Sequence, residues 1–326
     1  MKRAVISLLA LVLIISIVLI VVRYNRSSTA RIIGIVQWTT QPLLDETHQG
    51  LMAELNKLGL NDGKSYVVQS RNAQADLTVA SQIVRQFVDD DAALIIAIAT
   101  PAAQQAAKNA KTIPVVFAAI TDPVKAGLVD SIQLPGRNLT GTSNRWPFEK
   151  QISLIPKIVP GARRIGVVWN TSEANSEAAL AVIRPLLRDG GYTIVERPAL
   201  TTNEVASAIR SIANDVDAFL MIPDNTALSA TATIVKTVLE VGKPLIGGDL
   251  DTVRKGSLGS YGYNYLQLGQ VTAQMVKEIL VDRKNPSLMP VRYPPAASLV
   301  INQGEARKFG ITFPSELISE AGEVIK

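Results

Sequence analysis

Short runs of valine, isoleucine and other apolar residues alternate with longer amphipathic stretches from residue 31 onward. The runs are apolar at consecutive positions, which is typical of strands buried on both faces, as in a parallel sheet covered by helices. The amphipathic stretches between them predict helices, for example over 44–58, 77–88 and 101–110. The predicted strands cover residues 32–38, 66–70, 94–100, 115–121, 164–170, 193–197, 218–223, 244–248 and 257–261.

The alternation of strands and helices occurs twice along the chain. A turn-rich stretch, Leu134-Pro-Gly-Arg-Asn-Leu-Thr-Gly141, interrupts it, and it begins again near Arg164. A chain of 326 residues is long enough for two domains. We therefore predict an α/β fold of two doubly wound parallel-sheet lobes, with a crossing between them near residues 140–150.

The amino terminus carries an apolar run over residues 4–22, with basic residues on both sides. Its length suits a helix that spans a bilayer and exceeds the apolar core of most cleaved signal peptides. Ser28 and Ala30 also fit a cleavage site, so both possibilities stay open. We expect residues 1–30 to be a membrane anchor or signal segment. The rest of the chain would then lie on the periplasmic or extracellular face of the cytoplasmic membrane, or be secreted after cleavage.

Composition and motifs argue against several classes of function. The formal charge of +5 comes with no dense basic run of the kind that binds nucleic acid. The chain has no cysteine, which excludes disulfides, thiolate metal sites and a lipid-modified cysteine. Its single histidine, His48, lies inside a predicted helix, and neither a nucleophile elbow nor a phosphate-binding glycine loop follows any strand. We predict a binding protein that is not an enzyme and needs no cofactor.

Polar residues stand where the predicted strands end. Ligands of open parallel sheets bind beyond the carboxyl ends of the strands, where helices also begin. Thr100 is expected to cap the helix that starts at Pro101, and Asn175-Ser176 to cap the helix over 177–187. The candidate ligand-binding residues are Gln37, Trp38, Thr100, Thr121, Asp122, Asn170, Asn175, Ser176, Asp224, Asn225 and Asp249.

These residue types suit an amino-acid-like ligand. A carboxylate of Asp122, Asp224 or Asp249 would hold an ammonium group, Thr100 and Ser176 would donate to a carboxylate, and Trp38 would form an aromatic wall. Alternatives remain open at this point. The three aspartates would also suit glycoside chemistry or a metal ion, and helix capping alone accounts for many polar residues after strands.

An ordered set of motifs resembles a known family. They include Gly34-Ile-Val-Gln-Trp38, Ile98-Ala-Thr-Pro-Ala-Ala103, Thr121-Asp-Pro-Val124, Pro135-Gly-Arg-Asn-Leu-Thr-Gly141, Asn170-Thr-Ser-Glu-Ala-Asn-Ser176, Pro223-Asp-Asn225 and Gly310-Ile-Thr-Phe-Pro314. Together they resemble the ABC-transporter substrate-binding family that includes tryptophan and tyrosine receptors, from about residue 32 to 320. Gln41 departs from the family, which commonly has a histidine at this position.

The resemblance implies a type I periplasmic-binding fold whose lobes close by a hinge around the ligand. It implies one lobe of residues 31–145 plus about 259–285, and a second of 146–258 plus about 286–326. The expected function is the extracytoplasmic substrate-binding component of an ABC transporter, a monomeric ectodomain with a membrane permease as partner. A membrane-anchored ectodomain that senses a ligand without transporting it is the alternative.

Overall fold

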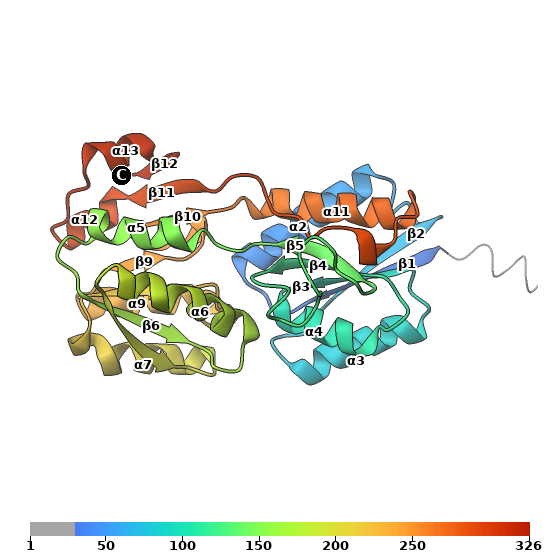
Figure 1. Cartoon of the computed structure of the whole chain (residues 1–326), viewed down its shortest axis with the longest axis horizontal. Coiled ribbons are helices and arrows are strands. Elements are labelled where there is room, and N and C mark those ends of the chain that lie inside the picture. Colours follow the sequence, from blue (N-terminus) through green and yellow to red (C-terminus); the bar gives the residue numbers. More distant parts are fainter. Residues whose placement is uncertain (1–29) are drawn as a thin grey trace, which may run out of the picture.

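The computed structural model describes residues 30–326. The predicted anchor or signal segment, apart from Ala30, lies outside the described residues. Within residues 30–326, none of the helices has the length and hydropathy needed to cross a bilayer. Two α/β lobes lie side by side along the long axis of the molecule (Figure 1).

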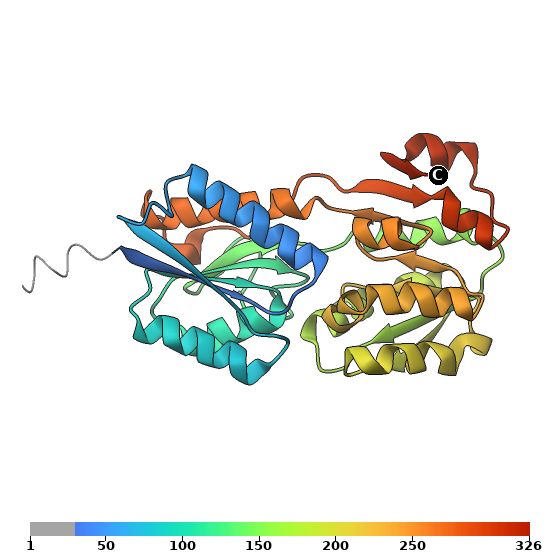
Figure 2. The ribbon, with the colours of Figure 1, turned by 180° about the vertical axis from the view of Figure 1, so that it is seen from behind.

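The first lobe is built on a five-stranded parallel sheet in the order β2-β1-β3-β4-β5. Helices α3 and α4 cover one face, and α2 and α11 cover the other (Figure 2). The strands are β1 (Arg31–Gln37), β2 (Tyr66–Asn72), β3 (Leu94–Ile98), β4 (Val115–Ile120) and β5 (Leu139–Ser143). The helices are α2 (Pro42–Lys57), α3 (Leu77–Asp89), α4 (Thr100–Asn109) and α11 (Tyr265–Leu280).

The second lobe contains a four-stranded parallel sheet in the order β7-β6-β8-β9. Its strands are β6 (Arg164–Trp169), β7 (Thr193–Pro198), β8 (Ala218–Met221) and β9 (Leu245–Gly247). Its helices are α5 (Phe148–Ile158), α6 (Ala174–Asp189), α7 (Val205–Ile212), α8 (Asn225–Ser229), α9 (Thr231–Glu240) and α10 (Leu250–Lys255), with 3₁₀ turns η1 (Thr202–Glu204) and η2 (Ala213–Asp215).

A small mixed sheet completes the second lobe. It consists of β10 (Gly259–Gly262), β11 (Ser298–Asn302) and β12 (Glu323–Ile325). Helices α12 (Gln303–Lys308) and α13 (Ser315–Glu320) lie between β11 and β12 in sequence. Strand β10 runs antiparallel to β11. The prediction of a parallel strand over residues 257–261 is therefore wrong in its direction of pairing. Its partner β11 comes from the carboxyl-terminal tail, which the alternation of apolar runs did not identify.

The contacts of β10 and α11 bear on where the chain crosses between the lobes. Strand β10 contacts α5, β9 and α10, whereas α11 packs on α2, β4 and β5. The 3₁₀ turn η3 (Pro286–Leu288) and residues up to Arg292 lie along β5, where the Arg292 amide donates to the Gly141 carbonyl at 2.9 Å. We propose that residues 144–147, 263–264 and 293–297 connect the lobes.

Two of these connecting segments are tied together by tyrosines. The buried Tyr265 hydroxyl accepts hydrogen bonds from Asn144 Nδ2 at 3.2 Å and Trp146 Nε1 at 3.0 Å. The Tyr263 hydroxyl donates to the Arg145 carbonyl at 3.1 Å. These bonds give the connection between the lobes a fixed local geometry.

Helices α2 and α11 touch through their backbones. A Cβ atom added to Gly269 would overlap the Thr47 carbonyl oxygen, and one added to Gly50 would overlap the Leu266 carbonyl oxygen. Only glycine allows this approach. The pair therefore fixes α11 on the first lobe although it follows the second lobe in sequence.

Candidate ligand-binding cleft

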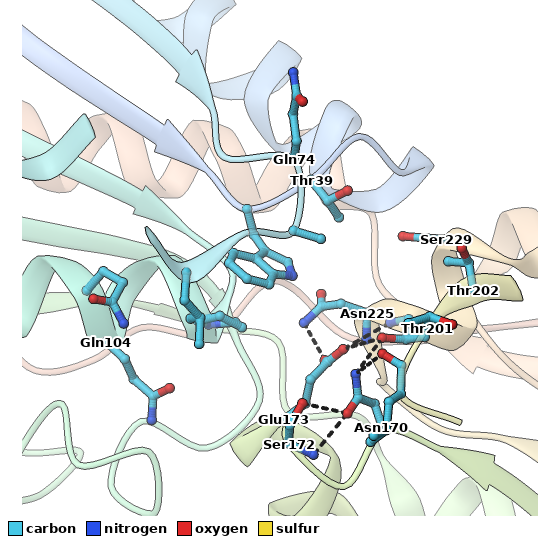
Figure 3. A pocket seen from close by; sticks show the side chains of 17 residues that line it. Thr39, Gln74, Gln104, Asn170, Ser172, Glu173, Thr201, Thr202, Asn225 and Ser229 are labelled. Atoms are coloured by element: carbon cyan, nitrogen blue, oxygen red, sulfur yellow. Dashed lines mark hydrogen bonds between the residues drawn. The ribbon is translucent and has the colours of Figure 1, made fainter. Parts of the chain in front are cut away.

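A cleft of about 520 Å³ opens between the two lobes. Figure 3 shows its polar side chains, which come from loops and helices that follow the strands of both lobes. Glu173, Asn170 and Asn225 form a connected hydrogen-bonded group on the second lobe. The lining includes Trp38, Thr39, Gln74, Pro101 and Gln104 from the first lobe and Asn170, Ser172, Glu173, Thr201, Asn225 and Thr226 from the second.

Two further cavities lie between the lobes. The smaller, of about 10 Å³, is lined by Thr100 and Thr121 from the first lobe, by the connecting residue Asn144, and by Asn175, Pro223 and Asn225 from the second lobe. Asn225 also lines the large cleft, so these two cavities share it as a lining residue. A third cavity, of about 190 Å³, is lined by Glu46, Asp249, Asp251, Arg254 and the connecting residue Tyr263.

The structure brings several predicted site residues to the interlobe surface. Trp38, Asn170 and Asn225 line the large cleft, and Thr100, Thr121, Asn175 and Asn225 line the small cavity. A side-chain hydrogen bond spans the interface, because Gln41 Nε2 donates to Asn225 Oδ1 at 3.0 Å. The two lobes therefore meet at the carboxyl edges of their sheets.

The two predicted helix caps are wrong. Thr100 is the first helical residue of α4, and Ala99 holds the cap position without a side-chain hydrogen bond. Helix α6 starts at Ala174 with Glu173 at the cap position, so Asn175 and Ser176 lie in its first turn. In both cases the chain enters the helix one or more residues earlier than the polar residue suggests.

The backbone before Thr100 is strained. Ala99 has φ 78° and ψ 156°, a region populated almost only by glycine. Ala119, one residue before the end of β4, also has a positive φ of 58°. Strained residues of this kind persist where the surroundings impose them and concentrate at binding sites. Ala99 directly precedes Thr100, and Ala119 lies two residues before Thr121; both threonines line the small interlobe cavity.

Replacing Ala99 with glycine should stabilise the protein by about 1 kcal/mol, because the strain it relieves exceeds the entropy that glycine adds to the unfolded chain. Urea unfolding of the two proteins measures the difference. The control is Ala107→Gly inside α4, where ordinary helical geometry predicts a loss of about 1 kcal/mol. A loss of stability in both variants would show that Ala99 carries no strain.

Asp224 is fully buried and its carboxylate is occupied by protein donors. It accepts hydrogen bonds from the Asn170 amide at 2.7 Å, the Ser176 hydroxyl at 2.6 Å and the Ala227 amide at 2.7 Å. Burial, and then the negative charge of Glu173, raise the pKa of Asp224. Asp224 and Ser176 therefore brace the loops beneath the cleft rather than lining any of the three cavities.

The side chains of the other two aspartates and of Gln37 also form hydrogen bonds with other residues of the chain. Asp122 accepts from the amides of Val124 and Lys125. Asp249 accepts from the Thr252 amide and hydroxyl at the start of α10, where burial raises its pKa, and it lines the third cavity. Gln37 Nε2 donates to Asp45 Oδ1 and the Thr39 carbonyl. The three aspartates share no hydrogen-bond partner, and residues 30–326 hold no acidic or histidine cluster suited to a metal ion.

Glu173 is the residue that the sequence reasoning missed. It is buried, and its carboxylate accepts hydrogen bonds from Asn175 Nδ2, from both nitrogens of Asn225, and from the Thr226 amide and hydroxyl, at 2.7 to 3.1 Å. Its position inside the motif Asn170–Ser176, just before a helix, was the available signal. It organises the second-lobe side of the cleft.

Two α/β lobes that present polar strand ends to a shared cleft define a two-lobed ligand-binding protein. Residues 32–325 match the family model described as ABC transporter substrate binding protein. The chain belongs to this family, and the resemblance drawn from its motifs is confirmed.

Individual relatives agree with this assignment. The chain is 34% identical over 271 residues to the tyrosine-binding protein of Clostridioides difficile strain R20291, covering 83% of this chain and 78% of the relative. A Streptococcus pneumoniae ABC domain in complex with L-Trp is 32% identical with a TM-score of 0.87, covering 91% of this chain and 100% of that one. A ligand-free, open substrate-binding protein with adhesive properties from Clostridium difficile is 33% identical with a TM-score of 0.68, again covering 91% and 100%. The predicted fold class is confirmed by these structures.

Proposed function

We propose that this protein is the extracytoplasmic receptor of an ABC transporter and closes its lobes around a small amino-acid-like ligand, with an aromatic side chain favoured. The observation that carries the proposal is the cleft of about 520 Å³ whose lining comes from both lobes. A ligand bound there contacts both sheets at once, so its binding energy favours the closed arrangement.

The comparison of lobe arrangements supports hinge closure. The two relatives with solved structures have nearly the same identity to this chain, 32% and 33%, yet the TM-score is 0.87 for the L-Trp complex and 0.68 for the ligand-free, open protein. The difference is therefore better explained by lobe arrangement than by divergence of the sequences. The present lobe arrangement is nearer to that of the complex.

The lining chemistry suits an amino acid with an apolar ring. Trp38 and Pro101 offer apolar surface in the large cleft. The hydroxyl-bearing residues Thr39 and Thr201 line the large cleft and would donate to a carboxylate. Thr100, predicted for that role, lines the small cavity. Ser176, predicted for that role, instead donates to Asp224. The names of the relatives, a tyrosine-binding protein and a complex with L-Trp, make tyrosine and tryptophan the first ligands to test.

The partners follow from the transporter role. A membrane permease would receive the ligand from the cleft, and an amino-terminal apolar helix, residues 4–22, would tether a monomeric ectodomain to the cytoplasmic membrane, unless the leader is cleaved. Uptake of the identified ligand by cells with and without this gene separates transport from ligand sensing. Uptake that does not depend on the gene would favour the sensing ectodomain.

Thermal and urea unfolding of the full chain with each L-amino acid tests the ligand class. A ligand at 100 times its dissociation constant should stabilise the folded protein by about 2.7 kcal/mol. Trp38→Ala is the test variant. It removes the proposed aromatic wall, so it should reduce the stabilisation by aromatic ligands more than that by other ligands. If no amino acid stabilises the wild-type protein, the proposed ligand class is wrong.

A further inference from the structure

Three buried amides at the interlobe surface have side-chain oxygens without a hydrogen-bond donor. They belong to Gln41, Asn144 and Asn175, whose exposed fractions are 2%, 3% and 4%. Asn144 and Asn175 line the small cavity, and Gln41 adjoins it through its hydrogen bond to Asn225. Leaving a buried acceptor unpaired costs free energy. Within the described residues, these three oxygens are therefore candidate acceptors for the N–H groups of a ligand.

One carboxylate fixes the orientation of two of these amides. Asn175 Nδ2 donates to Glu173 Oε2 at 3.0 Å and to the Pro223 carbonyl at 2.9 Å, and both partners only accept. Asn225 Nδ2 donates to the same Glu173 oxygen at 2.7 Å, which leaves Asn225 Oδ1 to accept from Gln41 Nε2. The oxygens of Asn175 and Gln41 are therefore the free ends of two hydrogen-bonded chains that start at Glu173.

The second-lobe side of the interface also carries negative charge. Glu173 and Asp224 are 6% and 0% exposed, and neither forms an ion pair with any residue in the described part of the chain. Their mutual repulsion and burial are reflected in the raised pKa of Asp224. A cation placed beside the free amide oxygens would offset this charge.

The size of the cavity restricts the cation. A space of about 10 Å³ holds one water-sized group, which matches a primary ammonium and is too small for a guanidinium. The body of the ligand would lie in the cleft of about 520 Å³, which shares Asn225 with the small cavity.

From these four observations we infer that the small cavity is an ammonium subsite. The amide oxygens of Asn144 and Asn175, with Gln41 beside them, accept the N–H groups of the ligand, and Glu173 is the positioning residue that orients the amides and supplies the charge. The inference rests on the proposed function, since it assumes a ligand between the lobes. It assigns to neutral amides the role that sequence reasoning gave to Asp122, Asp224 and Asp249.

Calorimetric titration of the purified full chain with three sets of ligands tests the inference. L-tryptophan and L-tyrosine carry both charged groups, tryptamine and tyramine keep the ammonium, and indole-3-propionate and 3-(4-hydroxyphenyl)propionate lack it. We expect the wild-type protein to bind each amino acid at least about 10-fold more tightly than its desamino analogue, from the strength of hydrogen bonds to charged groups. Glu173→Gln should weaken amino-acid binding by about 10- to 100-fold and leave the desamino acids within about 3-fold, since the latter never use the acceptors.

Two further variants complete the design. Glu177→Gln, on the same helix but exposed and paired with Arg184, should leave every affinity unchanged. Gln41→Met removes one free oxygen without touching Glu173 and should also reduce the preference for the ammonium, which keeps the test valid if Glu173→Gln does not fold. Circular dichroism checks the folding of each variant.

The outcomes separate the inference from the proposed function. Desamino acids that bind the wild-type protein as tightly as the amino acids, or a preference for the ammonium that Glu173→Gln and Gln41→Met both leave unchanged, would overturn the inference and leave the receptor function standing. If the aromatic probes fail but another amino acid binds, the same ratio is measured with that amino acid and its desamino acid. If no ligand with an ammonium group binds, the inference and the proposed ligand class both fall.

Discussion

Replacing Gly269 with alanine should lower the free energy of unfolding by about 3 kcal/mol or more. The added methyl group would overlap the Thr47 carbonyl oxygen and crowd the Gly50 backbone, neither of which belongs to a flexible side chain that can move aside. Relief requires α11 to shift away from α2, which opens the close contact between the two helices. The intrinsic helix preference of alanine, about 1 kcal/mol over glycine, offsets only part of this cost.

Urea unfolding of Gly269→Ala beside Gln270→Ala isolates the effect. Gln270 is the next residue of the same helix and is exposed, so its replacement should change the stability by no more than about 0.5 kcal/mol. Equal stability of the two variants would mean that α2 and α11 separate at little cost and that their backbone contact does not hold α11 in place.

Replacing Asp224 with alanine should destabilise the ligand-free protein by about 3 to 5 kcal/mol. The substitution leaves three donors, from Asn170, Ser176 and Ala227, without an acceptor in a region closed to water. These donors hold the loops after β6 and β8 together, so ligand affinity should fall as a consequence of lost order. Urea unfolding without ligand gives the first quantity, and calorimetry with ligand gives the second.

Asp122→Ala is the matched control for this substitution. Asp122 occupies the equivalent place after a strand of the first lobe, but it bonds only two neighbouring amides of an exposed turn, so about 1 kcal/mol is expected. If Asp224→Ala keeps the stability of the wild-type protein and loses only affinity, then Asp224 contacts the ligand directly and our structural role for it is wrong.

The strands buried on both faces could be predicted closely from the sequence. The predictions over 32–38, 94–100, 115–121 and 164–170 match β1, β3, β4 and β6 to within one or two residues at each end. Continuous apolar runs carry this information locally. Strand β5, Leu139–Ser143, was read as a turn because its sequence is Leu-Thr-Gly-Thr-Ser. It is a buried strand because distant partners satisfy its hydroxyls, with Thr140 donating to the Met289 carbonyl and Thr142 bonding to Thr272.

The candidate site could be predicted as a region but not as a set of contacts. The rule that ligands bind beyond strand ends led to Trp38, Thr100 and Asn225, which line interlobe cavities. The same rule could not show that the Asp224 carboxylate already accepts hydrogen bonds from donors of its own lobe. Nor could it find Glu173, whose importance lies in partners about 50 residues away in sequence.

The path of the chain also decides the order in which the protein can be completed during synthesis. The four-stranded sheet and its helices lie within one uninterrupted stretch, so their partners emerge from the ribosome in sequence. The five-stranded sheet is made first, yet the part of its face beside α2, over β4 and β5, stays open until α11 has been synthesised, after all of that stretch. The amino-terminal half thus waits for a helix that is made after the whole four-stranded sheet, and it would present apolar surface to chaperones for much of translation.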